Sequence, residues 1–342
     1  MAGPPLSSYA GQIVRFAAPL LRIRYRDGLY VTLHGFPDWF SYARALVELA
    51  PPPASASADE VRVIDVLAAN QVMLAAGDPL WTAPEMGAVA TPDGWAWAHL
   101  ARSRRLALVP AEAYAAFRHA GGIATLDADH SGSGLVVPRA RGTVSLPGEG
   151  PAPEKELTEL EGQLPAPLPA AYREFLAATN GGRPATPAVH PRFGFVVDQT
   201  FFGFGRRDWF GNLSHVRQWL KDKFTADFLP IGHVQGGTLA VRLTGEDAGS
   251  VWYYDDDDPR DDDSYDADEV AERLLRRCAD SFDRFVGALV PVPDTLIQAA
   301  QTLVRDGGAR QLPEPGLGLG LPTDKRPPAP STGNEPGNEG GR

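Results

Sequence analysis

The sequence predicts an α+β protein of two domains, joined by a linker and followed by a disordered tail. Its 342 residues are enough for two domains. The composition, with 43% hydrophobic and 22% charged residues, is typical of a globular chain. Residues 129–153 have linker composition, because Ser-Gly-Ser-Gly occurs there together with several prolines. Residues 306–342 are rich in Pro and Gly, which predicts disorder. We therefore expect a first domain over 11–128 and a second over 154–305.

Charge and cysteine content restrict the possible functions. The net charge of −11 disfavours nucleic acid as the main partner, because phosphate binding requires clustered Lys and Arg. The single cysteine, Cys278, excludes a disulfide framework and a cysteine-based zinc site. The sequence contains neither a signal-peptide pattern nor a run of about 20 apolar residues, so we expect a cytoplasmic protein that does not bind membranes. No cofactor motif is recognisable, and we expect neither a cofactor nor a metal.

Strand and helix signals of the first domain surround several tryptophans. In chain order they are a turn leading to a short strand (35–43), an apolar stretch (61–70), a tryptophan-rich segment (92–99), an apolar segment (106–110) and a proline-initiated helix (111–118). The motifs GFPDWF.YA, R..D...AN, GWAWAH, LVP and HAGG occur in this order. This set resembles the WHH-type toxins of the HNH/endonuclease VII nuclease group over about residues 35–126. The resemblance implies a ββα-metal-like fold, in which active members use histidines to activate water and to hold a divalent ion.

The resemblance also implies that the nuclease site is degenerate in this chain. Ala98 stands in place of the first histidine of the pair, and Tyr114 in place of the helix histidine. Alanine cannot bind a metal and neutral tyrosine is a poor ligand, so only His99 and His119 remain of four imidazoles. We expect no catalytic residue; if the domain is a nuclease, His99 and His119 are the candidates. Otherwise both hydrogen-bond locally, and the domain is a decoy, a dimerisation surface or a docking platform.

The second domain opens with a sharply bounded helix. Pro169 suits the first helical position, because its ring fixes φ and the missing N–H is not needed there. Tyr172 and Leu176 lie one turn apart on an apolar face. Asn180 and the two glycines that follow accept the left-handed conformation that ends a helix. The sequence therefore predicts a short amphipathic helix that packs against the rest of the domain.

Three further elements follow this helix. They are a glycine-broken turn that runs into a strand (230–243), a second strand (249–255) and a closing amphipathic helix (281–289). The ordered motifs LP..Y..FL...NGG, P.IG...GG, G.V.YYD and SF..FV..L resemble the SUKH superfamily over about residues 154–290. Bacterial members of that superfamily are mostly immunity proteins of polymorphic toxin systems. The resemblance implies a mixed α+β domain that binds protein partners and has no catalytic centre.

An acidic run that begins at Asp255 is the strongest charge feature of this domain. One interpretation is a solvated loop before a helix whose N-terminus favours negative charge, and another is a binding surface for a basic partner such as a nuclease toxin. The oxygen spacing of an EF-hand calcium loop is not reproduced. The candidate partner-binding residues are Asp255, Asp256, Asp257, Asp258, Asp261, Asp262, Asp263, Trp209 and Trp252. Other aromatic residues nearby are expected in the core, and exposed ones would be interface anchors.

These features favour a non-catalytic binding protein of the immunity type, which belongs to a bacterial polymorphic toxin system. Its SUKH-like domain would neutralise a partner toxin. The alternative is a divergent metal-dependent HNH-type nuclease that uses His99 and His119. A third possibility is a structural scaffold with neither role.

Overall fold

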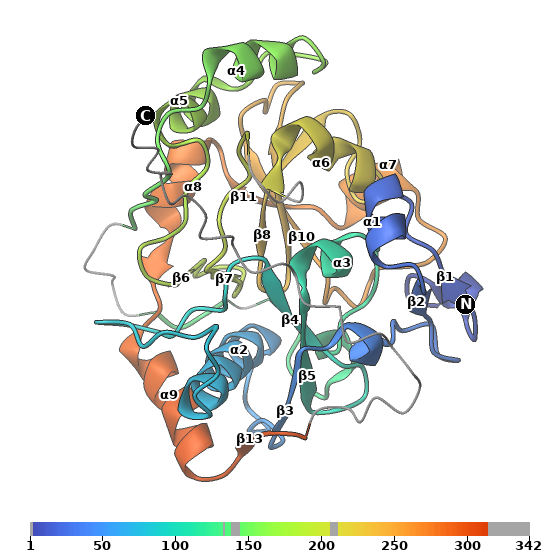
Figure 1. The fold of residues 1–342 in the computed structure, drawn as a ribbon, viewed down its shortest axis with the longest axis vertical. Coiled ribbons are helices and arrows are strands. Elements are labelled where there is room, and N and C mark those ends of the chain that lie inside the picture. The colour runs from blue at the N-terminus through green and yellow to red at the C-terminus, as the bar shows by residue number, and fades with distance from the viewer. Residues whose placement is uncertain (1–2, 133, 138–143, 206–210, 314–342) are drawn as a thin grey trace, which may run out of the picture.

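A computed structural model describes residues 3–132, 134–137, 144–205 and 211–313 (Figure 1). The fold is mixed α+β, as the sequence predicts, and the named strands in these ranges pair antiparallel. Within the same ranges, no helix combines the length and the apolar character that a membrane span requires. The predicted disordered tail lies outside the described residues beyond residue 313.

The first unit is built on a four-stranded sheet with strand order β13-β3-β5-β4. Its strands are β3 (Ala45–Leu49), β4 (Trp95–His99), β5 (Arg105–Pro110) and β13 (Ala309–Gln311). Helix α2 (Ala58–Ala75) begins at a capping box, in which the amide of Glu60 donates to the Ser57 hydroxyl at 3.2 Å and the Ser57 amide donates to the Glu60 carboxylate. Helix α9 (Asp294–Arg305) lies beside α2 (Figure 1).

The end of the chain completes this sheet, and this arrangement differs from the predicted domain boundaries. Strand β13 pairs with β3, so residues 306–313 include a strand and are not part of a disordered tail. Helix α9 buries Leu296, Ile297 and Ala300 in the same apolar cluster as α2. Residues 294–313 therefore belong structurally with the first unit. The amphipathic pattern of α9 predicts a helix, but it does not indicate which core the helix covers.

Residues 144–293 form a second unit, which is inserted into the first. Its main sheet has strand order β11-β10-β9-β8. The strands are β8 (Phe228–Val234), β9 (Gly237–Arg242), β10 (Val251–Asp255) and β11 (Arg276–Ala279). The predicted turn starting at residue 230 is instead part of β8, and the chain turns at Gly236, whose φ of 103° favours glycine.

Helices surround this second sheet. They are α4 (Glu154–Glu161), α5 (Ala170–Thr179), α6 (Leu213–Trp219), α7 (Ala267–Arg273) and α8 (Phe282–Ala288). Helix α5 confirms its prediction, because Pro169 immediately precedes it and Asn180 ends it in the left-handed conformation with φ of 50°. Tyr172 of α5 packs against Phe282 of α8, with ring centroids 5.1 Å apart.

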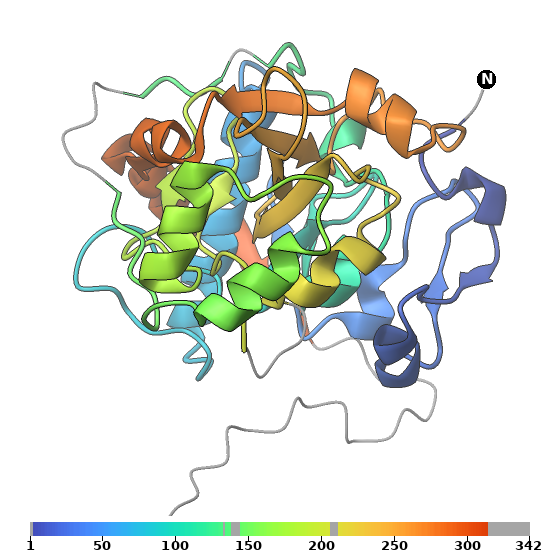
Figure 2. The same ribbon diagram turned by 90° about the horizontal axis from the view of Figure 1, so that it is seen from above.

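Shorter elements connect the two units and form an N-terminal arm. The connecting strands β6 (Ala188–Val189), β7 (Val196–Val197) and β12 (Val290–Pro291) form a three-stranded sheet. The arm lies at the edge of the molecule (Figure 2) and contains η1 (Ser7–Tyr9), β1 (Ile13–Val14), α1 (Pro19–Arg24), β2 (Leu29–Tyr30) and η2 (Trp39–Tyr42). Two short helices follow β5, namely α3 (Ala111–Ala115) and η3 (Ile123–Thr125).

The apolar cores of the two units are continuous. One buried cluster contains Trp39 and Ala98 of the first unit together with Phe195 and Tyr253 of the second. Another contains residues of α2 and α9 together with Val196. The junction between the units is therefore part of the protein interior, and the residues found there cannot be assumed to lie in solvent.

Candidate functional site

The first unit contains a strand–strand–helix segment formed by β4, β5 and α3. In the β4–β5 pair, Trp97 lies opposite Leu108. The side chains of β4 alternate, so that Ala98 faces one buried cluster and Trp97 the other. The indole N–H of Trp97 donates to Asn70 Oδ1 at 2.8 Å, and that of Trp81 donates to the same atom at 3.0 Å. Trp97 thus attaches the segment to α2.

His99 lies at the end of β4 and contacts a carboxylate of α2. Its Nε2 is 3.2 Å from Asp65 Oδ2, and the histidine is 9% exposed. Both oxygens of Asp65 also accept hydrogen bonds from the guanidinium of Arg104, each at 2.8 Å. Asp65 therefore already has a bidentate partner, and this histidine–carboxylate–arginine group is a local structural network.

His119 is fully buried among aromatic rings. Its ring centroid lies 4.6 Å from that of Tyr114 and 5.3 Å from that of Trp39. Nδ1 lies 3.0 Å from the carbonyl oxygen of Phe117. Burial lowers the pKa of His119 to about 3, and the nearby Lys223 adds to this effect. The imidazole is therefore neutral at physiological pH.

The residues present do not fit the divalent ion that a ββα-metal fold implies. Ala98 is completely buried, and the ring of Tyr114 packs against His119 in the interior. His99 and His119 each contact a different partner, Asp65 and the Phe117 carbonyl. In the part of the chain that the structure describes, no three His, Cys, Asp or Glu side chains are arranged to hold a metal ion. The expectation that these histidines hydrogen-bond locally agrees with this geometry.

The acidic loop, Asp255–Asp263, lies against the first unit. Arg62 of α2 donates to Asp255 Oδ1 at 3.0 Å and to Asp257 Oδ2 at 3.3 Å. The amide of Ile123 donates to Asp257 Oδ1 at 3.0 Å, and the amide of Gly121 donates to the Asp256 carbonyl at 2.6 Å. The backbone and the side chains of this loop are thus both bound by the nuclease-like unit.

Cations of the second unit pair with the same loop. The ammonium of Lys223 donates to Asp256 Oδ1 at 2.9 Å, and neither side chain is exposed to solvent. Arg276 donates to Asp258 Oδ2 at 2.9 Å, and Arg260 contacts the same carboxylate. A carboxylate buried to this extent requires such pairing, because leaving it unpaired would cost several kcal/mol.

The pKa values of the loop reflect its burial. Burial raises the pKa of Asp256 to about 7, although Lys223 opposes the shift. Burial also raises the pKa of Asp257 and of Asp261. For Asp258, hydrogen bonds from two arginines outweigh burial, so its pKa lies below the ordinary value.

The structure corrects the interpretation of the acidic run as a solvated loop. Five of the predicted partner-binding residues are buried: Asp255, Asp256, Asp257, Asp258 and Asp261. Asp262 and Trp252 are half-buried, and so is Asp263, which accepts hydrogen bonds from the amides of Leu6 and Ser8 in the N-terminal arm. Trp209 lies outside the described residues. The physical reason is that two of the cations that neutralise the run, Arg62 and Lys223, come from other parts of the chain and bury it.

Sequence reasoning missed the two buried cations that organise this junction. The sequence does indicate a buried role for Arg62, because a charged residue within the apolar stretch 61–70 needs a partner. Lys223 had none, since it lies in the polar segment Lys-Asp-Lys-Phe, which is typical of a surface.

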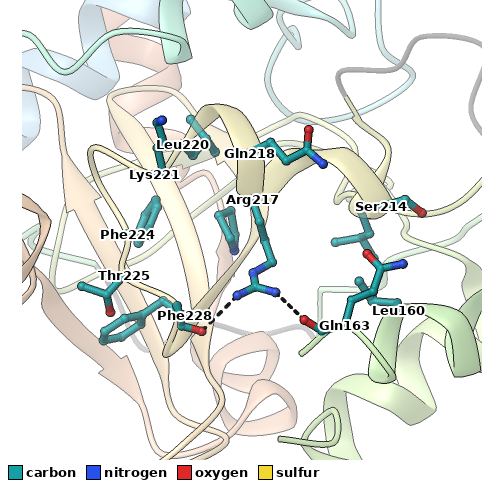
Figure 3. A pocket seen from close by; sticks show the side chains of 13 residues that line it. Leu160, Gln163, Ser214, Arg217, Gln218, Leu220, Lys221, Phe224, Thr225 and Phe228 are labelled. Atoms are coloured by element: carbon teal, nitrogen blue, oxygen red, sulfur yellow. Dashed lines mark hydrogen bonds between the residues drawn. The ribbon is translucent and has the colours of Figure 1, made fainter. Parts of the chain in front are cut away.

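A separate groove of about 310 Å³ lies on the second unit, between the end of α4, helix α6 and strand β8 (Figure 3). The guanidinium of Arg217 crosses it and donates to the carbonyls of Gln163 at 3.1 Å and of Ala226 at 3.4 Å. Leu160 and Phe224 contribute apolar surface. None of the predicted site residues lines this groove.

A strand–strand–helix unit of nuclease type is therefore joined, through a buried junction, to a second α+β unit. Comparison with known families agrees with both resemblances. Residues 87–129 match the family described as a nuclease of the HNH/ENDO VII superfamily with conserved WHH. Residues 151–288 match the SMI1 / KNR4 family (SUKH-1). No curated protein matches the chain. The SUKH-1 match ends before α9, in agreement with the packing of α9 on the first unit.

Proposed function

We propose that this chain is a non-catalytic binding protein of the immunity type, which acts in the cytoplasm within a bacterial polymorphic toxin system and neutralises a partner toxin through its SUKH-like domain. The observation that carries the proposal is the SUKH-1 match over residues 151–288. The state of the nuclease-like unit supports it. Two expected imidazoles are replaced by Ala98 and Tyr114, and His119 is neutral and enclosed.

Binding to toxins encoded beside this chain tests the proposal. Isothermal titration calorimetry of the full chain with catalytically inactive versions of those toxin domains should give saturable binding to one of them. Trp252→Ala should weaken this binding, because Trp252 is a half-buried ring next to the acidic loop. Arg105→Ala, an exposed change on the first sheet, is the matched control. If no neighbouring toxin binds and none is neutralised in cells, the proposal is wrong.

The alternative is a divergent metal-dependent nuclease that uses His99 and His119. The match of residues 87–129 to the WHH nuclease family favours it. A plasmid-nicking assay with Mg²⁺, Mn²⁺ or Zn²⁺ separates the two candidates. The binding proposal expects intact plasmid with each ion, whereas cleavage that is lost in His99→Ala would establish the nuclease.

A further inference from the structure

In the described part of the chain, the hydrogen bonds to the Asp257 carboxylate come from groups of the first unit. Its Oδ2 accepts from Arg62 Nε at 3.3 Å, and its Oδ1 accepts from the Ile123 amide at 3.0 Å. Asp257 is 3% exposed and Arg62 is 2% exposed. The two donors, Arg62 and Ile123, lie on α2 and η3 of the nuclease-like unit, while the accepting carboxylate of Asp257 belongs to the inserted unit.

Gly121 gives this carboxylate the room it needs. A Cβ at position 121 would lie 2.2 Å from Asp257 Oδ1 and 3.0 Å from Asp257 Cγ, so a side chain there would displace the carboxylate. The amide of Gly121 meanwhile donates to the Asp256 carbonyl at 2.6 Å. A guanidinium N–H of Arg62, the amide of Ile123 and the side-chain-free Gly121 therefore surround the Asp257 carboxylate on one side of the junction, and the same guanidinium also pairs with Asp59 and Asp255.

We propose that Arg62, Gly121 and Ile123 form an oxyanion-binding site of the nuclease-like unit, here called the oxyanion cradle, and that the acidic loop fills this cradle from within the same chain. The ligand class is an oxyanion with two oxygens at carboxylate or phosphate spacing. Arg62 offers such a ligand one charged donor, Nε, because its two Nη atoms donate to Asp59 and Asp255, and the Ile123 amide adds a neutral donor of fixed position. Carboxylate and phosphate anions share this chemistry; because the junction is buried we expect a small free anion, and a nucleic-acid phosphate is the other outcome that the test distinguishes.

An alternative is that Asp257 and Arg62 are only a structural ion pair. The two interpretations differ in what happens when the carboxylate is removed but the cradle is kept. A structural pair leaves a defect that small ions do not repair. A binding site remains competent, and a free oxyanion of similar shape takes the place of the side chain and stabilises the fold in proportion to its occupancy.

The test is anion rescue of Asp257→Ala in the full chain. Its melting temperature is measured as sodium formate or inorganic phosphate is raised to several hundred millimolar, against sodium chloride at equal ionic strength. When formate or phosphate is present at about ten times its own dissociation constant, we expect the melting temperature to be about 3 °C higher than in chloride. Asp257→Asn is the matched control, because it removes the same charge but leaves the cradle filled, and its melting temperature should respond to formate as to chloride.

Two further measurements complete the test. The double variant Asp257→Ala/Arg62→Met should lose the rescue. If Asp257→Ala is unfolded in chloride, the folded fraction seen by circular dichroism as formate is added gives the same readout.

A short DNA duplex is the second probe. We expect it to leave the melting temperature unchanged, because the junction is closed, and stabilisation by the duplex would assign the cradle to nucleic-acid phosphate. Equal response of Asp257→Ala to formate, phosphate and chloride would overturn the proposal, whether or not a toxin binds.

Discussion

Replacement of Arg62 by methionine should destabilise the whole chain. Arg62 is 2% exposed and pairs with Asp255 at 3.0 Å, with Asp257 at 3.3 Å and with Asp59 at 3.4 Å. Without it, Asp255 keeps Arg276 at 3.6 Å, but Asp257 forms no second ion pair among the described residues. Removal of one partner of a buried pair costs about 3–5 kcal/mol, because the other charge stays buried. We expect a loss of about 4 kcal/mol, or a drop in melting temperature on the order of 10 °C.

Urea unfolding followed by tryptophan fluorescence and by circular dichroism measures this loss. The control is Arg310→Met, because the side chain of Arg310 is 70% exposed in its pair with Glu48, and the unfolding midpoint should not change. The double variant Arg62→Met/Asp257→Asn should regain about 1–2 kcal/mol, since it removes the charge that the single change leaves unpaired.

Two outcomes would refute this reasoning. A loss below about 1 kcal/mol in Arg62→Met would mean that water or a local shift solvates Asp257 without cost. A double variant that is no more stable than Arg62→Met would mean that the damage comes from lost packing of the arginine stem and not from the unpaired carboxylate. In either case the Asp257 carboxylate would not depend on the charge of Arg62.

Three further predictions concern other parts of the molecule. Burial and Lys223 lower the pKa of His233 to about 3. Below about pH 6.5 the unfolded chain therefore binds a proton at this histidine that the folded chain does not bind. The free energy of unfolding falls as the pH drops from about 6.5 towards 3. His233→Asn should therefore reduce the loss of unfolding free energy between about pH 7 and about pH 5 by about 2 kcal/mol, and an unchanged loss would contradict this. Asn180→Ala should lower the free energy of unfolding by about 2 kcal/mol and Asn180→Gly by about half of that. Both variants lose the hydrogen bonds to the Phe204 backbone at 2.7 and 3.0 Å, but only alanine disfavours the left-handed φ of 50°. Ile297→Ala on α9 should cost about 2–3 kcal/mol in a single unfolding transition, and two separate transitions would argue against the insertion of the second unit into the first.

Local signals predicted part of the local structure correctly, whereas the turn expected from residue 230 is part of β8 and the strand expected in 35–43 is the 3-10 helix η2. Proline before a helix, an aromatic face and Asn-Gly-Gly after it are sufficient for α5, because capping and periodicity act within a few residues of the sequence. The order GWAWAH, LVP and helix likewise agrees with β4, β5 and α3. The identities of Ala98 and Tyr114 reveal the loss of the nuclease imidazoles without any structure.

Long-range placement could not be predicted in the same way. Arg62 and Asp257 are separated by 195 positions, and no local pattern links them. An isolated aspartate run is typical of a solvated loop. The burial of Asp255–Asp258 could be recognised only from the three-dimensional positions of the cations that pair with them. Strand β13 has the same difficulty, because three residues after a predicted helix carry too little pattern to indicate pairing with β3 across the whole chain.

Burial of the acidic loop changes where attraction for a basic partner must come from, but it does not remove it. The ion pairs of the junction involve six carboxylates, of Asp59, Asp255, Asp256, Asp257, Asp258 and Asp261, and five cations, of Arg62, Arg118, Lys223, Arg260 and Arg276. Burial is the main cause of the raised pKa of several of these carboxyls, and the surplus of one negative charge among these groups is only a small part of the net charge of −11. Most of that charge lies on residues outside the junction, where it contributes to the long-range field that steers association. A basic toxin would therefore still be attracted to this chain, but its contacts must be made by residues other than Asp255–Asp258.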